Sequence, residues 1–220
     1  MVNLPKIDPE SELHPLKNKF LDASKYIDVD HPAVAEAAAR IANGAQSKTD
    51  LVRNAFTFVR DDIRHSWDDR RSGKPTCKAS EVLLEGTGWC YAKSHLLAAL
   101  LRANHIPAGL CYQRLILDEA AATYCLHGLN AVYLEDHGWL RLDARGNKPG
   151  IDARFDPPGE FLAFALSHLG EFQLPEIWPE PLNEITRTLE ACESDEAVFL
   201  NLPDVTVLPH LIASNGNRSR

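Results

Sequence analysis

Residues 86–105 read GTGWCYAKSHLLAALLRANH, and this stretch decides the fold. Two glycines form a turn just before Cys90, and small and apolar residues then recur at helical spacing. Pro107 ends the pattern, because proline cannot donate to the hydrogen-bond ladder of a helix. The sequence therefore predicts a helix of about four turns that begins near Cys90. The amide groups and the dipole of its first turn stabilise a thiolate, which is the nucleophilic form of cysteine.

The residues before this stretch predict three helices. They are rich in helix-forming or periodic apolar residues, and they run from Pro32 to about Gly44, from the cap Ser47 through Ile63, and from the cap Thr76 through Leu84. Residues 66–75, SWDDRRSGKP, are polar and contain glycine and proline, which indicates a loop.

The residues after Pro107 change to an alternating pattern that is typical of strands. The predicted strands are residues 109–117, 127–134 and 139–143, with a turn at Glu135–Gly138 between the last two. Helices followed by an antiparallel meander indicate an α+β fold rather than alternating strand–helix units. Pro181 is expected to open a last helix with Leu182, Ile185, Leu189 and Cys192 facing inward.

This order suggests one catalytic core with two flanking parts. We expect an N-terminal arm at residues 1–30, the core at residues 31–158, and a C-terminal extension at residues 159–220 that packs on the core. The extension could serve as a lid or an autoinhibitory segment.

Composition narrows the class of protein. The chain has 220 residues, with 45% hydrophobic and 25% charged residues, which excludes a wholly disordered, collagen-like or disulfide-scaffold protein. A net charge of -8 argues against binding to nucleic acid, since phosphate contacts need clustered cations. No apolar run reaches the ~20 residues of a membrane span, and no secretory signal is visible, so we expect a cytoplasmic protein that does not bind membranes. The five cysteines lack C-x-x-C spacing and are expected to be free thiols.

Cys90 has candidate partners on the predicted strands. A thiol nucleophile needs a base and a group that orients the base. His127 opens one predicted strand, and Asp143 ends the strand that follows the turn, so both lie at the same edge of the sheet. Cys90 could instead be a small buried hydrophobic residue, and Asp143 could simply close a turn.

Three segments of the chain resemble the transglutaminase-like superfamily of cysteine enzymes. They are GTGWCYAKSHLLAALLRANHIPAG around Cys90, HGLNAVYLEDHGW around His127 and WLRLDA around Asp143, and the resemblance covers roughly residues 50–150. His105 replaces the glycine of the family's GIPA pattern. The resemblance implies a papain-like core with the cysteine at a helix N-terminus, packed against an antiparallel sheet that carries histidine and aspartate. It also implies thioester chemistry on a carboxamide or peptide bond.

Several neighbouring residues have less specific interpretations. Trp67 is a candidate second oxyanion donor or substrate wall, or a core residue beside a loop. Trp89 and Tyr91 flank the thiol and could line an acyl pocket. His95 and His105 are expected at the surface. Cys125 is expected on the same strand face as His127, where a second thiol near Cys90 or a redox disulfide is conceivable.

The sequence predicts an enzyme that forms a thioester at Cys90, with His127 as base and Asp143 as its orienting group. We expect hydrolysis of a peptide or protein amide, although transfer to an amine stays open. No cofactor is expected, and no metal either, because the ligand spacing of a zinc site is missing. The alternative is a non-enzymatic binding module that keeps the cleft. The oligomeric state is not predicted.

Overall fold

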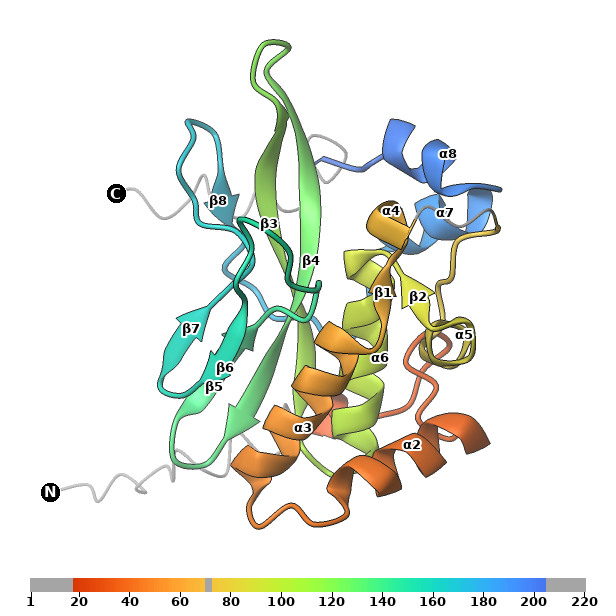
Figure 1. The fold of residues 1–220 in the computed structure, drawn as a ribbon, viewed down its shortest axis with the longest axis vertical. Coiled ribbons are helices and arrows are strands. Elements are labelled where there is room, and N and C mark those ends of the chain that lie inside the picture. Colours follow the sequence, from red (N-terminus) through yellow and green to blue (C-terminus); the bar gives the residue numbers. More distant parts are fainter. Residues whose placement is uncertain (1–17, 70–72, 205–220) are drawn as a thin grey trace, which may run out of the picture.

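The computed structural model describes residues 18–69 and 73–204 (Figure 1). Its helices are α2 (Pro32–Ala42), α3 (Lys48–Asp61), α4 (Ser66–Asp69), α5 (Ala79–Glu85), α6 (Cys90–Ala103), α7 (Asn183–Ala191) and α8 (Asp195–Leu200). Its strands are β1 (Arg64–His65), β2 (Thr87–Gly88), β3 (Ala108–Asp118), β4 (Thr123–Leu134), β5 (Gly138–Leu142), β6 (Arg154–Asp156), β7 (Gly159–Phe161) and β8 (Phe172–Gln173). Within these residues, no helix is long and apolar enough to cross a membrane.

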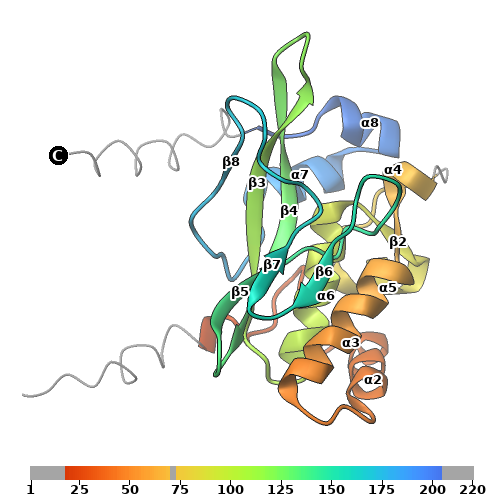
Figure 2. The same ribbon diagram turned by 60° about the vertical axis from the view of Figure 1, so that its left-hand side comes forward.

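The main sheet has four strands in the order β5-β4-β3-β8, and all neighbours are antiparallel. Helices α2, α3, α5 and α6 lie on one side of it, so the molecule has a helical layer and a sheet layer (Figure 2). Because helices precede the meander along the chain, the predicted α+β fold is confirmed.

Helix α6 forms the centre of the core. It contacts α2, α3 and α5 on one side and β3 and β4 on the other, and every residue from Cys90 to Arg102 is buried. Because the helix is enclosed all round, its sequence is mostly small and apolar instead of amphipathic. The predicted helix from Cys90 is confirmed, and the thiol lies on its first residue.

The upstream helices begin largely where the sequence indicates. His31 caps α2 with Pro32 as its first residue, and the Ser47 hydroxyl accepts a hydrogen bond from the Asp50 amide at the start of α3. The prediction that Thr76 caps α5 was wrong. Lys78 is the N-cap residue, and the Glu81 carboxylate accepts hydrogen bonds from the Cys77 and Lys78 amides. Thr76 instead donates its hydroxyl to the Thr87 carbonyl.

Two further elements differ from the prediction. The expected loop at residues 66–75 begins with the single turn α4, and residues 70–72 lie outside the described residues. Strand β4 begins at Thr123, so His127 lies inside the strand and not at its start. The first difference arises because the polar residues of α4 carry little periodic signal.

The flanking parts contact the core. Within the arm, residues 1–17 lie outside the described residues, while Ile27 is fully buried. In the extension, β8 joins the main sheet at Arg114, and α7 buries Ile185 and Leu189 as predicted. Pro181 does not open α7, which begins at Asn183. The boundaries at residues 30 and 158 remain predictions.

Candidate active site

Cys90 is positioned by a short parallel strand pair below the first turn of α6. Strand β1 pairs with β2 so that His65 lies opposite Gly88, two residues before the thiol. Trp89 is the N-cap residue of α6, and its side chain caps no amide of the first turn. These amides therefore remain available to a negative charge near the sulfur. The Cys90 side chain reaches solvent only slightly, since the residue is 7% exposed.

His127 and Asp143 form a buried pair on the sheet. His127 lies on β4, and Asp143 follows the last residue of β5. The two strands pair with Asn130 opposite Leu142, and this register brings Asp143 next to His127. His127 Nε2 lies 2.7 Å from Asp143 Oδ2. The carboxylate also accepts hydrogen bonds from the amides of Arg145 (3.1 Å) and Ala163 (3.1 Å), which fixes its orientation. With Nε2 bound to Asp143, Nδ1 is the ring nitrogen that remains for the thiol.

The charges of this pair stabilise each other. Burial disfavours the imidazolium, yet the charges of Asp143 and Cys90 and their hydrogen bonds raise the pKa of His127 to about 10. Burial would also raise the pKa of Asp143, but the charge of His127 and three hydrogen bonds hold that pKa below its usual value. The pairing thus favours the protonated form of His127 and the ionised form of Asp143.

The residue after His127 completes the contact with Cys90. The Gly128 amide lies 3.5 Å from Cys90 Sγ and donates toward the sulfur. A Cβ at Gly128 would lie 3.0 Å from Tyr91 Cα and 2.9 Å from Tyr91 Cδ1, so only glycine lets β4 approach the helix start this closely. The Tyr91 hydroxyl donates to the Leu126 carbonyl and also ties β4 to α6.

A cavity of about 360 Å³ borders the thiol. Cys90, His127, Trp67, Trp89 and Tyr91 all belong to its lining, whereas Asp143 lies behind His127. Trp67 stacks on Phe199 with 4.1 Å between ring centroids, and the Trp89 indole donates to Asp195 Oδ1 (2.7 Å). Tyr91 is fully buried. The structure therefore brings the sequence-predicted residues together around one cavity, and their catalytic or binding roles remain predictions.

The sequence matches the family model of the transglutaminase-like superfamily over residues 35–144, half of the chain. The chain belongs to this superfamily. Its members include cysteine proteases and transglutaminases and are typically enzymes. The match starts earlier than the three motifs around the candidate triad and includes most of α2 and all of α3.

Solved structures with a transglutaminase-like fold resemble this chain at low identity. The "Putative Cysteine Protease" of Cytophaga hutchinsonii shares 20% identity with a TM-score of 0.46, covering 65% of this chain and 45% of its own. The periplasmic domain of TgpA from Pseudomonas aeruginosa shares 18% with a TM-score of 0.43, covering 63% and 48%. Red sea bream transglutaminase shares 14% with a TM-score of 0.37, covering 86% and 31%. The chain thus spans less than half the length of these proteins. None of the curated proteins compared with it matches its sequence.

Two buried polar residues beside the site of this transglutaminase-like chain escaped the sequence analysis. His65 lines the cavity, and its buried Nδ1 has no hydrogen-bond partner. Burial and the charge of Arg145 hold the pKa of His65 well below its usual value, so this imidazole is neutral. Lys93, one turn beyond Cys90, donates to the carbonyls of Ile63 and Arg145, and burial lowers its pKa to about 7. The one sequence signal for Lys93 is a charged residue near the start of a helix that is mostly small and apolar.

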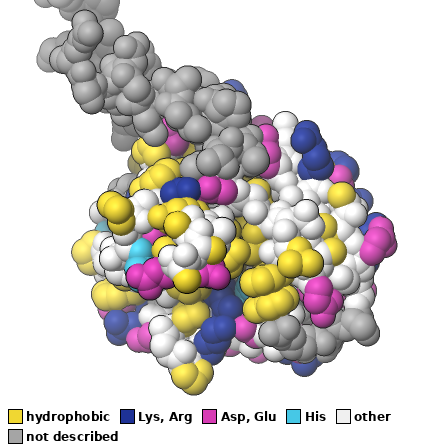
Figure 3. All heavy atoms as spheres, turned by 90° about the horizontal axis from the view of Figure 1, so that it is seen from above, with side chains coloured by type: hydrophobic (Ala, Val, Ile, Leu, Met, Phe, Trp, Pro, Cys, Tyr) yellow, Lys and Arg dark blue, Asp and Glu magenta, His cyan; other side chains and the backbone are white. Residues whose placement is uncertain are grey.

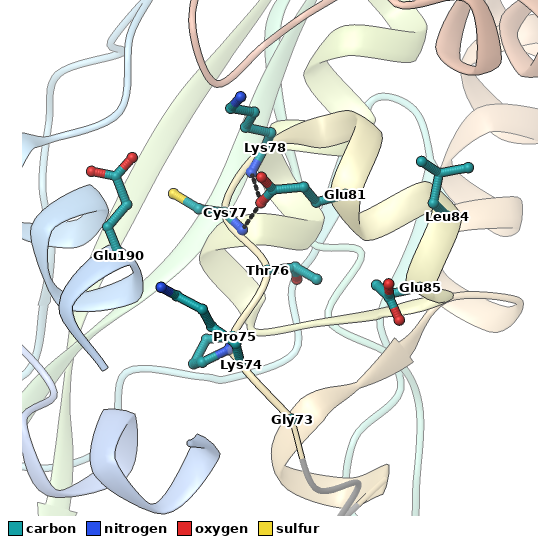
Figure 4. A pocket seen from close by; sticks show the side chains of 10 residues that line it. All are labelled: Gly73, Lys74, Pro75, Thr76, Cys77, Lys78, Glu81, Leu84, Glu85 and Glu190. Atoms are coloured by element: carbon teal, nitrogen blue, oxygen red, sulfur yellow. Dashed lines mark hydrogen bonds between the residues drawn. The ribbon is translucent and has the colours of Figure 1, made fainter. Parts of the chain in front are cut away.

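The other described thiols lack an imidazole partner. Cys77 borders a separate cavity of about 670 Å³, together with Lys74, Glu81 and Glu190 (Figure 4). Burial, with the charges of Glu190 and Glu81, raises the pKa of Cys77 to about 12. Cys125 lines the same cavity as Cys90, as its strand position predicts, and burial raises its pKa to about 12 as well. All five cysteines are free.

His95 corrects one prediction. It is fully buried and not at the surface, and its Nδ1 lies 2.7 Å from the Cys77 carbonyl oxygen. His105 is exposed as expected. Among the described residues, no group of three or more histidine, cysteine or acidic side chains is arranged to hold a metal ion.

Proposed function

We propose that the protein is a thiol-dependent acyl-transfer enzyme that forms a thioester at Cys90 and hydrolyses a peptide or protein amide. One observation carries the proposal: His127 bonds Asp143 through Nε2 at 2.7 Å while its cationic form is favoured by both Asp143 and Cys90. An imidazolium held beside a thiol at a helix start is the arrangement that produces a thiolate.

The first half of the reaction is acylation. The Cys90 thiolate attacks the carbonyl carbon of the amide, a C–S bond forms, and the carbonyl π electrons move to oxygen. We assign the binding of this oxyanion to amides of the first turn of α6, which no side chain of the N-cap residue caps. When the intermediate collapses, the C–N bond breaks and His127 gives its proton to the leaving amine, which leaves a thioester and a neutral imidazole.

The second half is hydrolysis. The neutral His127 removes a proton from water, the hydroxide attacks the thioester carbon, and the C–S bond breaks. The products are a carboxylic acid and the thiolate–imidazolium pair from which the cycle began. We favour water over an amine as acceptor, because water needs no dedicated binding site.

The second oxyanion donor is a separate question. Trp67 lines the cavity, and it is our candidate for this role or for a substrate wall. The Trp89 indole donates to Asp195.

The experiment is labelling with a limiting amount of iodoacetamide, followed by peptide mass spectrometry. Cys90 should react fastest at neutral pH, and His127→Ala should slow its alkylation at least about tenfold, because the thiolate loses its counter-ion. Cys77 supplies the internal control, since its protonated thiol should react slowly in both proteins. Equal labelling of all accessible cysteines would contradict an activated thiol.

The alternative is a binding module that keeps the cleft without turnover, and it would be favoured by a thiol sealed under the C-terminal extension. Cys90 lies on the wall of a cavity of about 360 Å³, so the structure does not supply that support.

A further inference from the structure

The segment Asp195–Asp204, here called the C-terminal strap, is fixed beside the cavity at several points. At its start, Asp195 accepts a hydrogen bond from the indole of Trp89, the residue before the thiol. In the middle, Phe199 stacks on Trp67 with an interplanar angle of 9°. The first part of the strap thus contacts two residues that line the cavity near the start of α6.

The far end of the strap is fixed to the sheet. The Leu126 amide donates to the Pro203 carbonyl at 2.7 Å, one residue before His127. Arg114 on β3 holds both carboxylate oxygens of Asp204, at 2.6 and 2.8 Å. The strap therefore crosses from the start of α6, which carries Cys90, to β3 and to β4, which carries His127.

The strap presents apolar side chains to the cavity. Phe199 and Leu202 belong to the lining, whereas Leu200 between them is 79% exposed. The rest of the wall is also mainly apolar, with contributions from Trp67, Leu115, Leu126, Phe164 and others.

The charged residues of the wall already have partners. Arg145 pairs with Asp68 at 2.7 Å. The carboxylate of Glu171 accepts hydrogen bonds from the amides of Ile116, Ser167 and His168. A charged substrate side chain would lose its water there without gaining a free counter-charge, which is costly.

Further apolar side chains are exposed beside the lining. Leu117 belongs to the lining, and the exposed side chains of Leu166, Leu169 and Phe172 are chain neighbours of lining residues. The view from above shows hydrophobic side chains interspersed with charged ones on this face (Figure 3). An extended peptide with apolar residues would find complementary surface there.

We propose that the cavity is the acyl-side specificity pocket, that it takes a large aliphatic or aromatic side chain next to the scissile carbonyl, and that the C-terminal strap forms one of its walls. This inference rests on the proposed function, because it assumes that Cys90 attacks that carbonyl. A cavity of about 360 Å³ is within the range of small-ligand pockets and is large enough for a leucine or phenylalanine side chain.

The test uses N-acetyl aminoacyl chloromethyl ketones with Leu, Phe, Gln, Asp or Lys side chains. The thiolate displaces chloride, a C–S bond forms and a C–Cl bond breaks, so the reaction requires no turnover. The rate constant for inactivation of Cys90 by each chloromethyl ketone is divided by the rate constant for its alkylation by iodoacetamide in the same protein. This ratio removes differences in the intrinsic reactivity of the thiol. The Leu or Phe reagent should exceed the Asp and Lys reagents at least about tenfold.

Strap variants show whether the wall contributes. Phe199→Ala and Leu202→Ala should each lower the relative rate of the Leu and Phe reagents about fivefold to tenfold, because the pocket loses apolar contacts. Leu200→Ala is the matched control, since its side chain leaves the same strap toward solvent. It should change the rates less than about twofold.

The outcomes separate the two proposals. If iodoacetamide labels Cys90 fastest but the five chloromethyl ketones react equally, or a charged one reacts best, the pocket inference is overturned and the proposed function stands. If the strap variants match Leu200→Ala, the strap is not a wall of the pocket. If Cys90 is not preferentially labelled at all, the proposed function fails and this inference fails with it.

Discussion

Cys77 and Cys90 are both buried free thiols beside cavities and near helix starts, yet their surroundings differ in chemistry. Cys77 has the larger cavity, about 670 Å³ against about 360 Å³, and acidic neighbours that favour its protonated form. Cys90 has the amide of Gly128 at 3.5 Å and the imidazole of His127, whose pKa is raised to about 10 by the charges of Asp143 and Cys90 and their hydrogen bonds. The histidine on the Cys77 side, His95, bonds the Cys77 carbonyl oxygen instead of its sulfur. If the proposed function holds, the feature that distinguishes the reactive thiol is the paired imidazole, and neither cavity size nor helix position.

The largest effect should come from removing each thiol in turn. Cys90→Ala should abolish amide hydrolysis, a loss of at least about a thousandfold, because no nucleophile remains. Cys77→Ala should keep activity within about twofold. Both variants are assayed with the same fluorogenic peptide amide, with circular dichroism as a control for folding. A large loss with Cys77→Ala at unchanged folding would contradict the distinction between the two sites.

The second test removes the charge that distinguishes the Cys90 side. Asp143→Asn should lower the rate about a hundredfold, because the imidazolium loses its buried counter-ion and its orientation. In the unmodified protein the rate should hold through neutral pH and fall as pH rises past about 10, where His127 loses the proton needed by the leaving amine. In Asp143→Asn this fall should begin at lower pH. An identical alkaline limb in both proteins would show that Asp143 does not set the protonation of His127.

The third test alters a glycine on each side. Gly128→Ala places a Cβ 3.0 Å from Tyr91 Cα, so β4 and the helix start must separate and His127 moves relative to Cys90. We expect about a tenfold to hundredfold loss of activity, since displacements near 1 Å have effects of that size. Gly73 on the Cys77 cavity is the matched control, because a Cβ there meets nothing within 4 Å. Gly73→Ala should leave the rate unchanged. Equal rates for both variants would remove the requirement for close approach.

The elements that the sequence predicts well are those with local signals. The glycine turn, the small-residue helix and the alternating strands placed Cys90, His127 and Asp143 within one site. The glycine of the family's GIPA pattern has a structural reason. His105, which stands at that position here, adopts a positive φ of 57°. A positive φ is easiest for glycine, so the motif reflects the backbone turn after α6.

The features that escaped prediction depend on distant contacts or on burial. Trp89 and Asp195 are 106 residues apart, and no local pattern links them. The close approach of Gly128 to Tyr91 depends on how β4 packs on α6. The surface position predicted for His95 was wrong because α6 is buried on all sides. In such a helix a polar residue does not mark an exposed face.

The smallest effect concerns the two imidazoles, whose protonation should change stability in opposite directions with pH. Burial and the charge of Arg102 lower the pKa of His95 to about 4, against the hydrogen bond to Cys77. The unfolded chain binds this proton near pH 6.5, so His95 favours folding above that pH and the benefit is lost as pH falls toward 4. For His127, with a folded pKa of about 10, the stabilisation is present below pH 6.5 and is lost as pH rises toward 10.

Urea unfolding at pH 7 and pH 5 isolates the His95 contribution. From pH 7 to pH 5 the unmodified protein should lose about 2 kcal/mol more free energy of unfolding than His95→Gln. The reason is that His95 becomes protonated in the unfolded chain but stays neutral in the folded protein, whereas glutamine does not titrate. His127 is unchanged in both proteins, so its opposite slope cancels in the difference. If the two proteins lose the same stability, His95 titrates in the folded state as it does in the unfolded chain. That result would contradict the claim that His95 is held neutral by burial. It would also remove the contrast between the pKa of His95 and the pKa of His127.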